Sequence, residues 1–520
     1  MAYPSLSKVL SLRERYSFIP IAETVWSDNL TPIRLFQHIR QPYSFLLESV
    51  EGGMMWARYS FIGHQPFLLF RAKGGTAYVE HFESLRGEEG GVKPTRKEKL
   101  EGSPFEALKK LLKQFKSPTD LHLPPFSGGA VGYVGYDAVS MLEPVPAHRK
   151  PVTDQDEIRL MFCSEMIAFD HLRQEVTFIS YLQLDPRMDD GEIKRAYEEK
   201  VAHLHRKIEA LTARLEGDGA QTFRLPHKLP PVDWGRVDSN FSRERFIQAV
   251  EKIKEYIKAG DIFQAVLSQR FSVTTSVSPF DIYRVLRMIN PSPYLYYLDL
   301  GDGEIVGSSP ERLVRVEQGT ITVNPIAGTR KRGETPEEDA RLAQELLNDE
   351  KERAEHYMLL DLGRNDVGRV AQFGSVHVPR LMTIEYFSHV MHIVSTAEGK
   401  VRPDCDLIDC LTACFPAGTV TGAPKVRAMQ IIAELEEEAR HAYSGAIGYF
   451  SFTGNMDACI AIRTIFIKDG QAHIQAGAGI VADSVPENEW HETRNKASAL
   501  LAAIQLAEMI FLGEEKKVHA

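Results

Sequence analysis

Residues 485–496 read VPENEWHETRNK and carry three charged side chains at helical spacing. Glu489, Glu492 and Lys496 are three and four positions apart, so a helix places all of them on one face. One such glutamate pair is typical of an exposed helix surface, where Glu492 and Lys496 contribute only about 0.3–0.5 kcal/mol as an ion pair. The stretch therefore predicts a helix and leaves two interpretations open, a solvated surface or half of a metal site.

A second glutamate pair with the same spacing, Glu352 and Glu355, lies in DEKERAEHYMLLDLGRND, residues 349–366. If the two helices face each other, four carboxylates converge, and carboxylates about 5 Å apart repel by roughly 1–3 kcal/mol per pair. Mg²⁺ offsets such repulsion, since it commonly binds one or two carboxylates while it holds an anionic substrate. The spacing does not show that the helices meet, and Glu352 is also placed to cap the start of its own helix.

Composition limits the classes of protein to consider. With 520 residues, 43% of them hydrophobic, the chain is long enough for more than one core, and a net charge of −10 argues against a nucleic-acid partner. Its five cysteines form no C-x-x-C pair, which suggests neither a disulfide framework nor a zinc ribbon and favours a reducing cytosol. No apolar run approaches the roughly 18 residues that span a bilayer. We therefore expect a cytoplasmic protein, without a membrane span, whose partners are small molecules or proteins.

Periodicity divides the chain near residue 235. Apolar residues at helical spacing predict a helix over residues 193–215, and a turn-rich stretch follows it. We expect two parts, residues 1–235 and 236–515. The second part begins with an amphipathic helix, SRERFIQAVEKIKEYIKAGD, that Gly260 ends, and continues into a strand in which Gln264 is the polar member of a mostly apolar face. Further strands are expected at 296–300, 304–309, 320–325, 446–453, 459–467 and 472–477. Such blocks of strands and helices predict an α+β fold.

Two glycine-rich stretches, GGAVGYVGYD (128–137) and SGAIGYFSF (444–452), invite comparison with a dinucleotide-binding loop. Their glycines recur every third residue, and no helix follows at the spacing that such a loop requires. They predict strands whose backbones approach a neighbour closely.

Eight motifs follow one another in the second part: GSSPERLV, NPIAGTRKRG, RAEHYMLLDLGRND, HVMHIVS, FPAGTVTGAPK, YSGAIGYF, AIRT and AGAGIVADSVPENEWHETRNKA. In this order they resemble the chorismate-utilising enzymes, and among them the anthranilate synthase component I family, over essentially all of residues 240–510. The first part resembles this family more weakly, through LLES (46–49), RYSFIG (58–63) and GGAVGYVGYD. The resemblance implies packed β-sheets flanked by helices, with chorismate as substrate and Mg²⁺ as cofactor.

The resemblance also implies roles for individual residues. Glu355 and Glu492 match direct Mg²⁺ ligands, and Glu352 and Glu489 match residues that support the metal through water. Glu311 matches the acid that protonates the departing C4 hydroxyl. The remaining positions match groups around the substrate: His392 at the ring, Thr329 and Thr419 at its oxygens, Tyr443 and Arg463 at the enolpyruvyl carboxylate, Gly477, Ala478, Gly479 and Lys496 at a carboxylate, and Gln264 beside the ring.

Two positions discriminate among the reactions of the family. Isochorismate and salicylate synthases have a lysine base where this chain has Gln264, and a neutral amide cannot deprotonate water. Aminodeoxychorismate synthases commonly have a nucleophilic lysine where this chain has Ala327. Ammonia then remains as the nucleophile, and the implied product is anthranilate. Two alternatives stay open: an aminodeoxychorismate synthase, since some members lack that lysine, and a non-catalytic tryptophan-sensing subunit.

Glutamine hydrolysis needs a nucleophilic cysteine, and none of the five cysteines lies in a G-x-C-x-G elbow. The resemblance therefore implies a separate glutamine amidotransferase subunit that supplies ammonia, in a heterotetramer. It also implies feedback inhibition by L-tryptophan at a site built by LLES and NPSPYL, with the residues Glu48, Ser49, Arg58, Ser60, Pro293, Tyr294 and Leu295. From the residues alone, the favoured interpretation of SFLLES (44–49) is a strand with a polar end.

Overall fold

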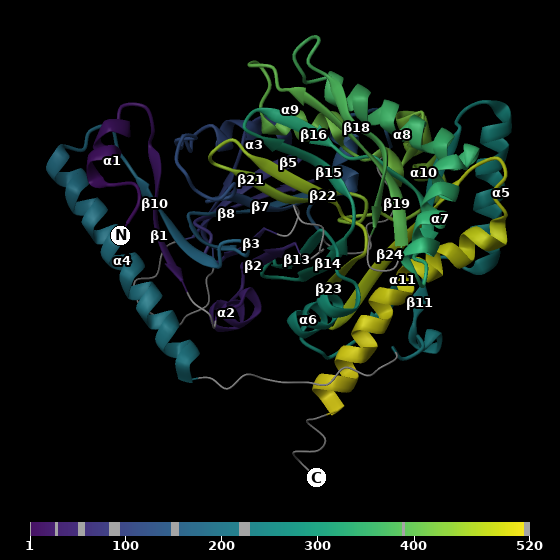
Figure 1. The fold of residues 1–520 in the computed structure, drawn as a ribbon, viewed down its shortest axis with the longest axis horizontal. Helices are drawn as coiled ribbons and strands as arrows, with labels where there is room; N and C mark the ends of the chain where they lie inside the picture. Colours follow the sequence, from purple (N-terminus) through teal and green to yellow (C-terminus); the bar gives the residue numbers. More distant parts are fainter. Residues whose placement is uncertain are drawn as a thin grey trace.

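The computed structural model describes residues 2–26, 30–49, 58–82, 94–146, 155–217, 229–386 and 390–513. In this described part of the chain, two antiparallel sheets of 12 strands each occupy the middle of the molecule, and helices lie outside them (Figure 1). The largest hydrophobic cluster lies between the sheets, with Tyr296 and Ile305 from one sheet and Val316 and Ala458 from the other. The α+β fold with packed sheets and flanking helices is confirmed.

The first sheet, sheet A, follows a path on which residues 1–235 and the rest of the chain each contribute one continuous block of strands. In order across the sheet its strands are β1 (Phe18–Trp26), β10 (Glu175–Gln183), β9 (Glu165–Asp170), β3 (Tyr59–Gly63), β2 (Phe45–Glu48), β13 (Tyr294–Asp299), β14 (Glu304–Ser309), β23 (Thr464–Lys468), β24 (Gln471–Ile480), β12 (Gln264–Thr274) and β11 (Asp238–Ser239), with β20 (Gly422–Ala423) paired to β12.

The second sheet, sheet B, is likewise shared by both parts of the chain. Its strands are β17 (Ile326–Lys331), β19 (Val390–Lys400), β16 (Thr320–Val323), β15 (Arg312–Glu317), β22 (Met456–Ile460), β21 (Ala446–Ser451), β7 (Gly129–Val134), β8 (Ile158–Cys163), β4 (Leu68–Lys73), β5 (Thr76–Phe82) and β6 (Pro94–Lys99), with β18 (His377–Tyr386) paired to β19.

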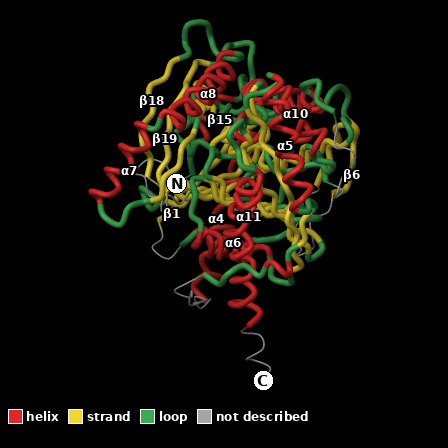
Figure 2. The backbone as a smooth tube through the Cα atoms, turned by 90° about the vertical axis from the view of Figure 1, so that its right-hand side faces the viewer, coloured by secondary structure: helices red, strands yellow, loops and turns green. Residues whose placement is uncertain are grey.

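Helices cover the outer faces of both sheets. Those against sheet A are α1 (Leu6–Leu12), α2 (Pro32–Ile39), α4 (Asp190–Gly217), α5 (Arg243–Ala259), α6 (Pro279–Ile289), α10 (Lys425–Leu435) and α11 (Pro486–Ala507). Those near sheet B are α3 (Pro104–Leu112), α7 (Pro336–Asn348), α8 (Glu350–Gly368) and α9 (Leu407–Cys414). Figure 2 shows α8 beside β19 and β18, and α6 and α11 together below them.

The expected boundary at residue 235 falls in a short 3-10 turn, Trp234–Arg236, after α4. Strands from the two sides of this boundary pair directly: β2 with β13 in sheet A and β7 with β21 in sheet B. The two parts of the chain therefore share both sheets and the core between them.

One expected strand is wrong in a way that shapes the site. Residues 459–467 were expected as a single strand, but the chain breaks into β22 of sheet B and β23 of sheet A. Arg463 lies at the break with a φ of +52°. The turn carries the chain from one sheet to the other, and the Arg463 guanidinium reaches the Lys496 carbonyl of α11.

The glycine-rich strands approach their neighbours as predicted. Gly132 of β7 lies opposite Gly448 of β21. A Cβ at Gly132 would meet the Arg159 carbonyl oxygen at 2.0 Å, and one at Gly448 would meet that of Asp457 at 2.1 Å. A side chain at Gly132 would push β7 away from β8, and one at Gly448 would push β21 away from β22.

Helix α11 continues into a π-helical turn, η4 (Glu508–Leu512), and the joined helix Pro486–Leu512 is long and apolar enough by length and composition to cross a membrane. This helix contradicts the expectation that no apolar stretch approaches the length needed to span a bilayer. Its apolar residues, among them Leu500, Leu501 and Ile504, are buried in the cluster shared with sheet A and α6. These contacts are those of a core helix.

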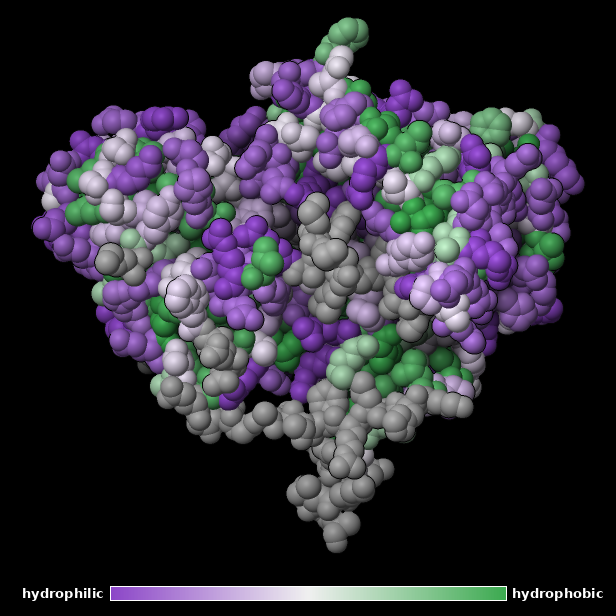
Figure 3. Space-filling view, viewed as in Figure 1, coloured by the Kyte–Doolittle hydropathy of each residue, from purple (hydrophilic) through white to green (hydrophobic). Residues whose placement is uncertain are grey.

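On the face of the molecule shown in Figure 3, the surface is mainly hydrophilic, with hydrophobic residues in separate groups.

Candidate active site

Glu311 lies just after β14, at the point where the chain passes from sheet A to β15 of sheet B. The Thr419 hydroxyl, in the 3-10 turn Gly418–Val420, donates a 2.8 Å hydrogen bond to the Glu311 carboxylate. Burial raises the pKa of Glu311 to about 7, although the Thr419 bond and the charge of Lys496 act in the opposite direction. Glu311 therefore holds a proton on a substantial fraction of molecules at neutral pH, as a general acid must.

His392 of β19 lies beside a bulge in β17. Gly328, with a φ of +68°, forms the bulge, and its carbonyl oxygen accepts a 2.8 Å hydrogen bond from His392 Nδ1. Since a carbonyl only accepts, the proton of neutral His392 is on Nδ1. Thr329 Oγ1 lies 3.1 Å from the same nitrogen. Burial lowers the pKa of His392, so the neutral ring predominates.

Lys496 links α11 to the strand that carries the glycine pair. Its ammonium donates to the Gly477 carbonyl at 2.9 Å and lies 2.7 Å from a Glu492 oxygen. The Arg463 guanidinium donates to the Lys496 carbonyl. Burial lowers the pKa of Arg463, and the nearby Tyr443 and Glu492 oppose this shift. Two cations and one carboxylate are thus collected at one place, as an anionic substrate requires.

Tyr443 and Gln264 lie against the glycines of β24. A Cβ on Gly477 would be 2.8 Å from the Tyr443 hydroxyl, and one on Gly479 would be 2.6 Å from the Gln264 amide nitrogen. A side chain at Gly477 would displace the Tyr443 hydroxyl, and one at Gly479 would displace the Gln264 amide. Ala478 between them faces the opposite way, into the core with α5 and α10, so only its backbone is available to a ligand.

The four expected metal-binding glutamates lie on α8 and α11. Burial raises the pKa of Glu355, and the charges of Glu352 and Glu492 raise it further. Burial also raises the pKa of Glu489, with a contribution from Glu492. The charges of the two helices therefore act on one another, as a shared site requires, while Glu492 itself is exposed and pairs with Lys496 of the same helix. Glu352 lies 3.4 Å from Arg330, while Asp349 caps α8 by accepting from the Glu352 backbone N–H at 3.1 Å.

These carboxylates suit one kind of metal. Among the described residues, no group of three or more histidine, cysteine, aspartate or glutamate side chains has a geometry that holds an ion unaided. A closed structural site of the zinc type is therefore not formed there. Mg²⁺ needs less from the protein, since it retains waters and takes one or two carboxylates together with substrate oxygens. Glu355 and its neighbours Glu352 and Glu492 offer the oxygen donors that such an ion takes, with Lys351 and Lys496 also near Glu355.

The expected effector motifs meet in sheet A. Leu295 of β13 lies opposite Glu48 of β2, and Ser60 is on β3, the next strand. The Glu48 carboxylate is buried and accepts from Tyr283 at 2.6 Å and from Arg287 at 2.8 and 3.1 Å. Ser60 Oγ lies 2.7 Å from His171 Nε2.

The remaining effector candidates are arranged differently. Arg58 pairs with Asp170 at 2.7 Å. Ser49 directly follows β2, Pro293 directly precedes β13, and both are half-buried. Tyr294 points to the other face of the sheet, since its hydroxyl accepts from Arg312 at 2.6 Å and donates to Asp457 at 2.9 Å. Its side chain therefore does not share the face of Glu48 and Leu295.

Sequence reasoning missed several polar residues around both sites. Tyr283 and Arg287 hold Glu48, and their spacing of four on α6 was a usable signal of a common face. Glu436 and Arg440 form a buried ion pair beneath Thr419 and Tyr443. Their spacing is also four, but nothing local distinguishes such a pair from an exposed one.

Comparison with known proteins agrees with this geometry. Residues 33–502 match the family model described as chorismate binding enzyme. The chain is 49% identical to anthranilate synthase component 1 of Bacillus pumilus over 98% of this chain and 97% of that protein, and 49% identical to the one of Acetivibrio thermocellus over 98% and 99%. The structure of component I from Streptococcus pneumoniae TIGR4 matches with a TM-score of 0.72 and 37% identity, covering 92% of this chain and 98% of that one.

A more distant structure shares the fold alone. The menaquinone-specific isochorismate synthase of Escherichia coli matches with a TM-score of 0.64 and 18% identity, over 96% of this chain and 98% of that one. Two findings indicate the same family: the identity of 49% over nearly the full length of the relatives, and the order of the motifs in the sequence. The chain belongs to the chorismate binding enzymes, in the branch formed by anthranilate synthase component 1.

Proposed function

We propose that this protein converts chorismate and ammonia to anthranilate and pyruvate, the first committed step of tryptophan biosynthesis. The observation that carries the proposal is the convergence of Glu311, His392, Arg463 and Lys496 with the two glutamate pairs on α8 and α11. Relatives named anthranilate synthase component 1 match along the whole chain and support the same reaction.

The residues beside the ring favour ammonia as nucleophile. Gln264, which lies against Gly479, takes the place of the lysine base that the resemblance assigns to isochorismate synthases, and its neutral amide is no base. Ala327, at the position of a possible covalent lysine, is a buried methyl group that cannot attack the ring. Ammonia needs no activating base once it is delivered unprotonated.

In the proposed reaction ammonia adds at C2 of chorismate while the C4 hydroxyl leaves with a proton from Glu311. Loss of the C2 proton and of pyruvate then makes the ring aromatic. Arg463 and Tyr443 hold the enolpyruvyl carboxylate, and Lys496 with the backbone of Gly477–Gly479 holds a second anionic group. His392, its Nδ1–H bound to Gly328, contacts the ring as a neutral imidazole.

Glu355 and Glu492 would bind Mg²⁺ directly, with Glu352 and Glu489 supporting it through water. When bound, the ion supplies electrostatic stabilisation of the ring carboxylate. The carboxylates orient that group, and Lys496 balances their charge on the side of Glu492.

We further propose that a glutamine amidotransferase subunit, the component 2 implied by the relatives' name, delivers the ammonia in a heterotetramer. The free cysteines Cys163, Cys405, Cys410, Cys414 and Cys459 support a cytoplasmic location. Residues 1–235 would form the regulatory portion, and tryptophan would bind on the face of sheet A that carries Glu48, Ser60 and Leu295. Arg58, Ser49 and Pro293 adjoin that face, whereas the Tyr294 side chain lies on the opposite face, so of the NPSPYL residues Leu295 is the one on the proposed effector face.

The experiment mixes purified protein with chorismate, Mg²⁺ and ammonium at alkaline pH and follows anthranilate fluorescence with and without a chelator. Fluorescence that the chelator abolishes supports both the reaction and the metal. Loss of chorismate without fluorescence would indicate aminodeoxychorismate instead, and no loss of chorismate would favour a sensing subunit.

A further inference from the structure

Arg440 and Glu436 form an ion pair that is withdrawn from water beneath the candidate active site. Their side chains are 0% and 3% exposed, and Arg440 Nε and Nη2 donate to the two Glu436 oxygens at 2.7 and 2.6 Å. A buried pair of this kind is favourable only when every remaining hydrogen-bonding position is also satisfied. The other partners of the guanidinium therefore show what the pair holds.

The remaining donors of Arg440 reach three separate segments. Nη1 donates to the Val420 carbonyl at 2.8 Å and to Ser444 Oγ at 3.4 Å, and Nη2 donates to the Val266 carbonyl at 2.7 Å. Together with the two bonds to Glu436, these contacts use all five N–H groups of the guanidinium. Glu436 in turn accepts from the backbone N–H and the hydroxyl of Ser268 at 2.7 and 2.9 Å.

Each of these contacts adjoins a residue that is proposed either to bind chorismate or to hold Glu311, the proposed general acid. Val420 follows Thr419, the partner of Glu311, and Ser444 follows Tyr443. Val266 lies opposite Gly479 on β24, and Ser268 lies opposite Gly477. The guanidinium thus joins the Thr419 turn, the Tyr443 loop and the strand that supports the glycine pair.

We propose that Arg440 is a positioning residue for the reaction. Through the carbonyls of Val420 and Val266 it holds Thr419 against Glu311 and keeps β12 in place behind Gly477 and Gly479. The proposal rests on the proposed function of that site. Lysine cannot replace arginine here, since an ammonium has three donors without the planar fork that spans both carbonyls and the carboxylate.

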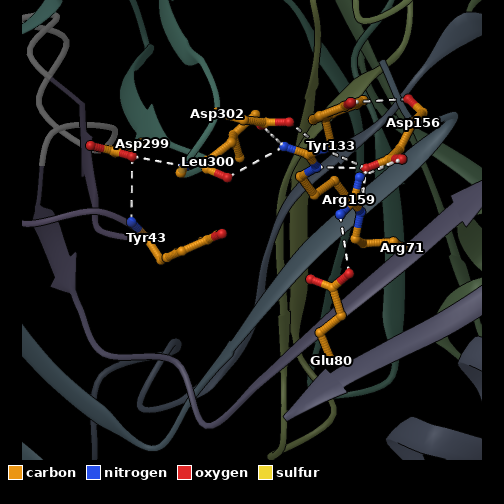
Figure 4. A network of polar contacts seen from close by, with 10 residues as sticks. Tyr43, Arg71, Glu80, Tyr133, Asp156, Arg159, Asp299, Leu300 and Asp302 are labelled. Atoms are coloured by element: carbon orange, nitrogen blue, oxygen red, sulfur yellow. Dashed lines mark hydrogen bonds and ion pairs between the residues drawn. The ribbon is translucent and has the colours of Figure 1, made fainter. Parts of the chain in front are cut away.

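Arg159 provides a matched control (Figure 4). Its side chain is 4% exposed, and it pairs with Asp156 and Asp302 and donates to the Leu300 carbonyl at 3.3 Å. None of these three partners belongs to the proposed site. Arg159→Lys therefore removes an equally buried fork and is expected to lower stability without altering chorismate binding.

The test compares the full-length wild type, Arg440→Lys and Arg159→Lys by kcat, KM for chorismate, pH profile and thermal midpoint, with free ammonia held constant. For Arg440→Lys we expect kcat/KM to fall by roughly 100-fold, as for other small misplacements of reacting groups. The decline of kcat/KM with rising pH should move to higher pH, because a weaker Thr419 bond lowers the pKa of Glu311 less. Arg159→Lys should change only the thermal midpoint.

A double variant separates positioning from general destabilisation. In a Thr419→Val background Arg440→Lys should shift the pH profile no further, since the bond it supports is already absent. An additive shift, or kinetics of Arg440→Lys that match those of Arg159→Lys, would overturn the proposal. If Arg440→Lys does not fold, Glu436→Gln is measured instead, with the same expectation. Failure of the proposed function is a different result, a wild type that forms no anthranilate.

Discussion

Thr419 donates a 2.8 Å hydrogen bond to Glu311, although the two residues are 108 positions apart. The bond joins the turn before α10 to the passage between the two sheets. It fixes the direction of a carboxyl group whose pKa burial raises to about 7. A carboxyl group that is oriented and protonated near neutral pH is suited to deliver a proton to a leaving hydroxyl.

Glu311→Gln should therefore reduce kcat by about 100- to 10,000-fold, the usual contribution of a general acid. KM for chorismate should change little, because the amide oxygen still accepts from Thr419. In the wild type the acid form is lost as pH rises, so kcat/KM, which reports the free enzyme, should fall through about pH 7 when free ammonia is held constant. Steady-state kinetics across pH check this, and a variant with wild-type kcat would remove Glu311 from the mechanism.

The proposed Mg²⁺ site predicts that substitutions of its glutamates weaken Mg²⁺ binding to different extents. Glu489→Gln should weaken Mg²⁺ binding by about 10- to 100-fold, as loss of an outer partner does, and Glu355→Gln should weaken it more because it removes a direct ligand. Glu345→Gln is the control, since Glu345 is exposed on α7 and pairs with Arg341. Mg²⁺-dependent shifts of the thermal midpoint give the affinities. Equal affinities in all three variants would refute the assignment.

Arg463→Lys should raise KM for chorismate by about 30-fold, the equivalent of roughly 2 kcal/mol for a hydrogen bond to a charged group. Its effect on kcat should be small, because the carboxylate is held in the ground state as well as in the transition state. The exposed Arg341→Lys on α7 should leave KM unchanged. A fall in kcat with constant KM would place Arg463 in the chemistry instead of in binding.

Ser49→Phe should fill the proposed effector site beside Glu48 and abolish inhibition by tryptophan while turnover is retained. The coupling that is lost corresponds to about 5- to 150-fold in affinity. Initial rates at increasing tryptophan concentration measure it, with the rate at zero tryptophan as the control for folding. Unchanged inhibition in Ser49→Phe would move the effector site elsewhere.

Local signals in the sequence located many elements correctly. Thr335 and Asp349 cap α7 and α8, and Gly260 ends α5 in the left-handed conformation, each as its residue type predicts. Such features depend on neighbours only a few positions away. The motif order supplied the candidate site residues, and the structure places Glu311 beside Thr419, His392 beside Thr329 and Lys496 beside Gly477.

Other features depend on partners far along the chain. Residues 459–467 read as one strand because the break at Arg463 is stabilised by the two sheets it joins, through contacts such as the Arg463 carbonyl with the Ser308 N–H at 3.0 Å. Glu436 is a buried ion because Ser268, 168 positions away, satisfies it. Tyr294 and Leu295 point to opposite faces because successive side chains of a strand alternate. The effector motif lists both residues and does not show which of the two faces the effector site.

The central claim is that one site carries out both the addition of ammonia and the loss of pyruvate. The most direct test measures chorismate consumed, anthranilate formed and pyruvate released by the purified chain with Mg²⁺ and ammonium. The account predicts equal amounts of all three at every time point. Chorismate loss without pyruvate, and with an amino product that keeps the enolpyruvyl group, would contradict it.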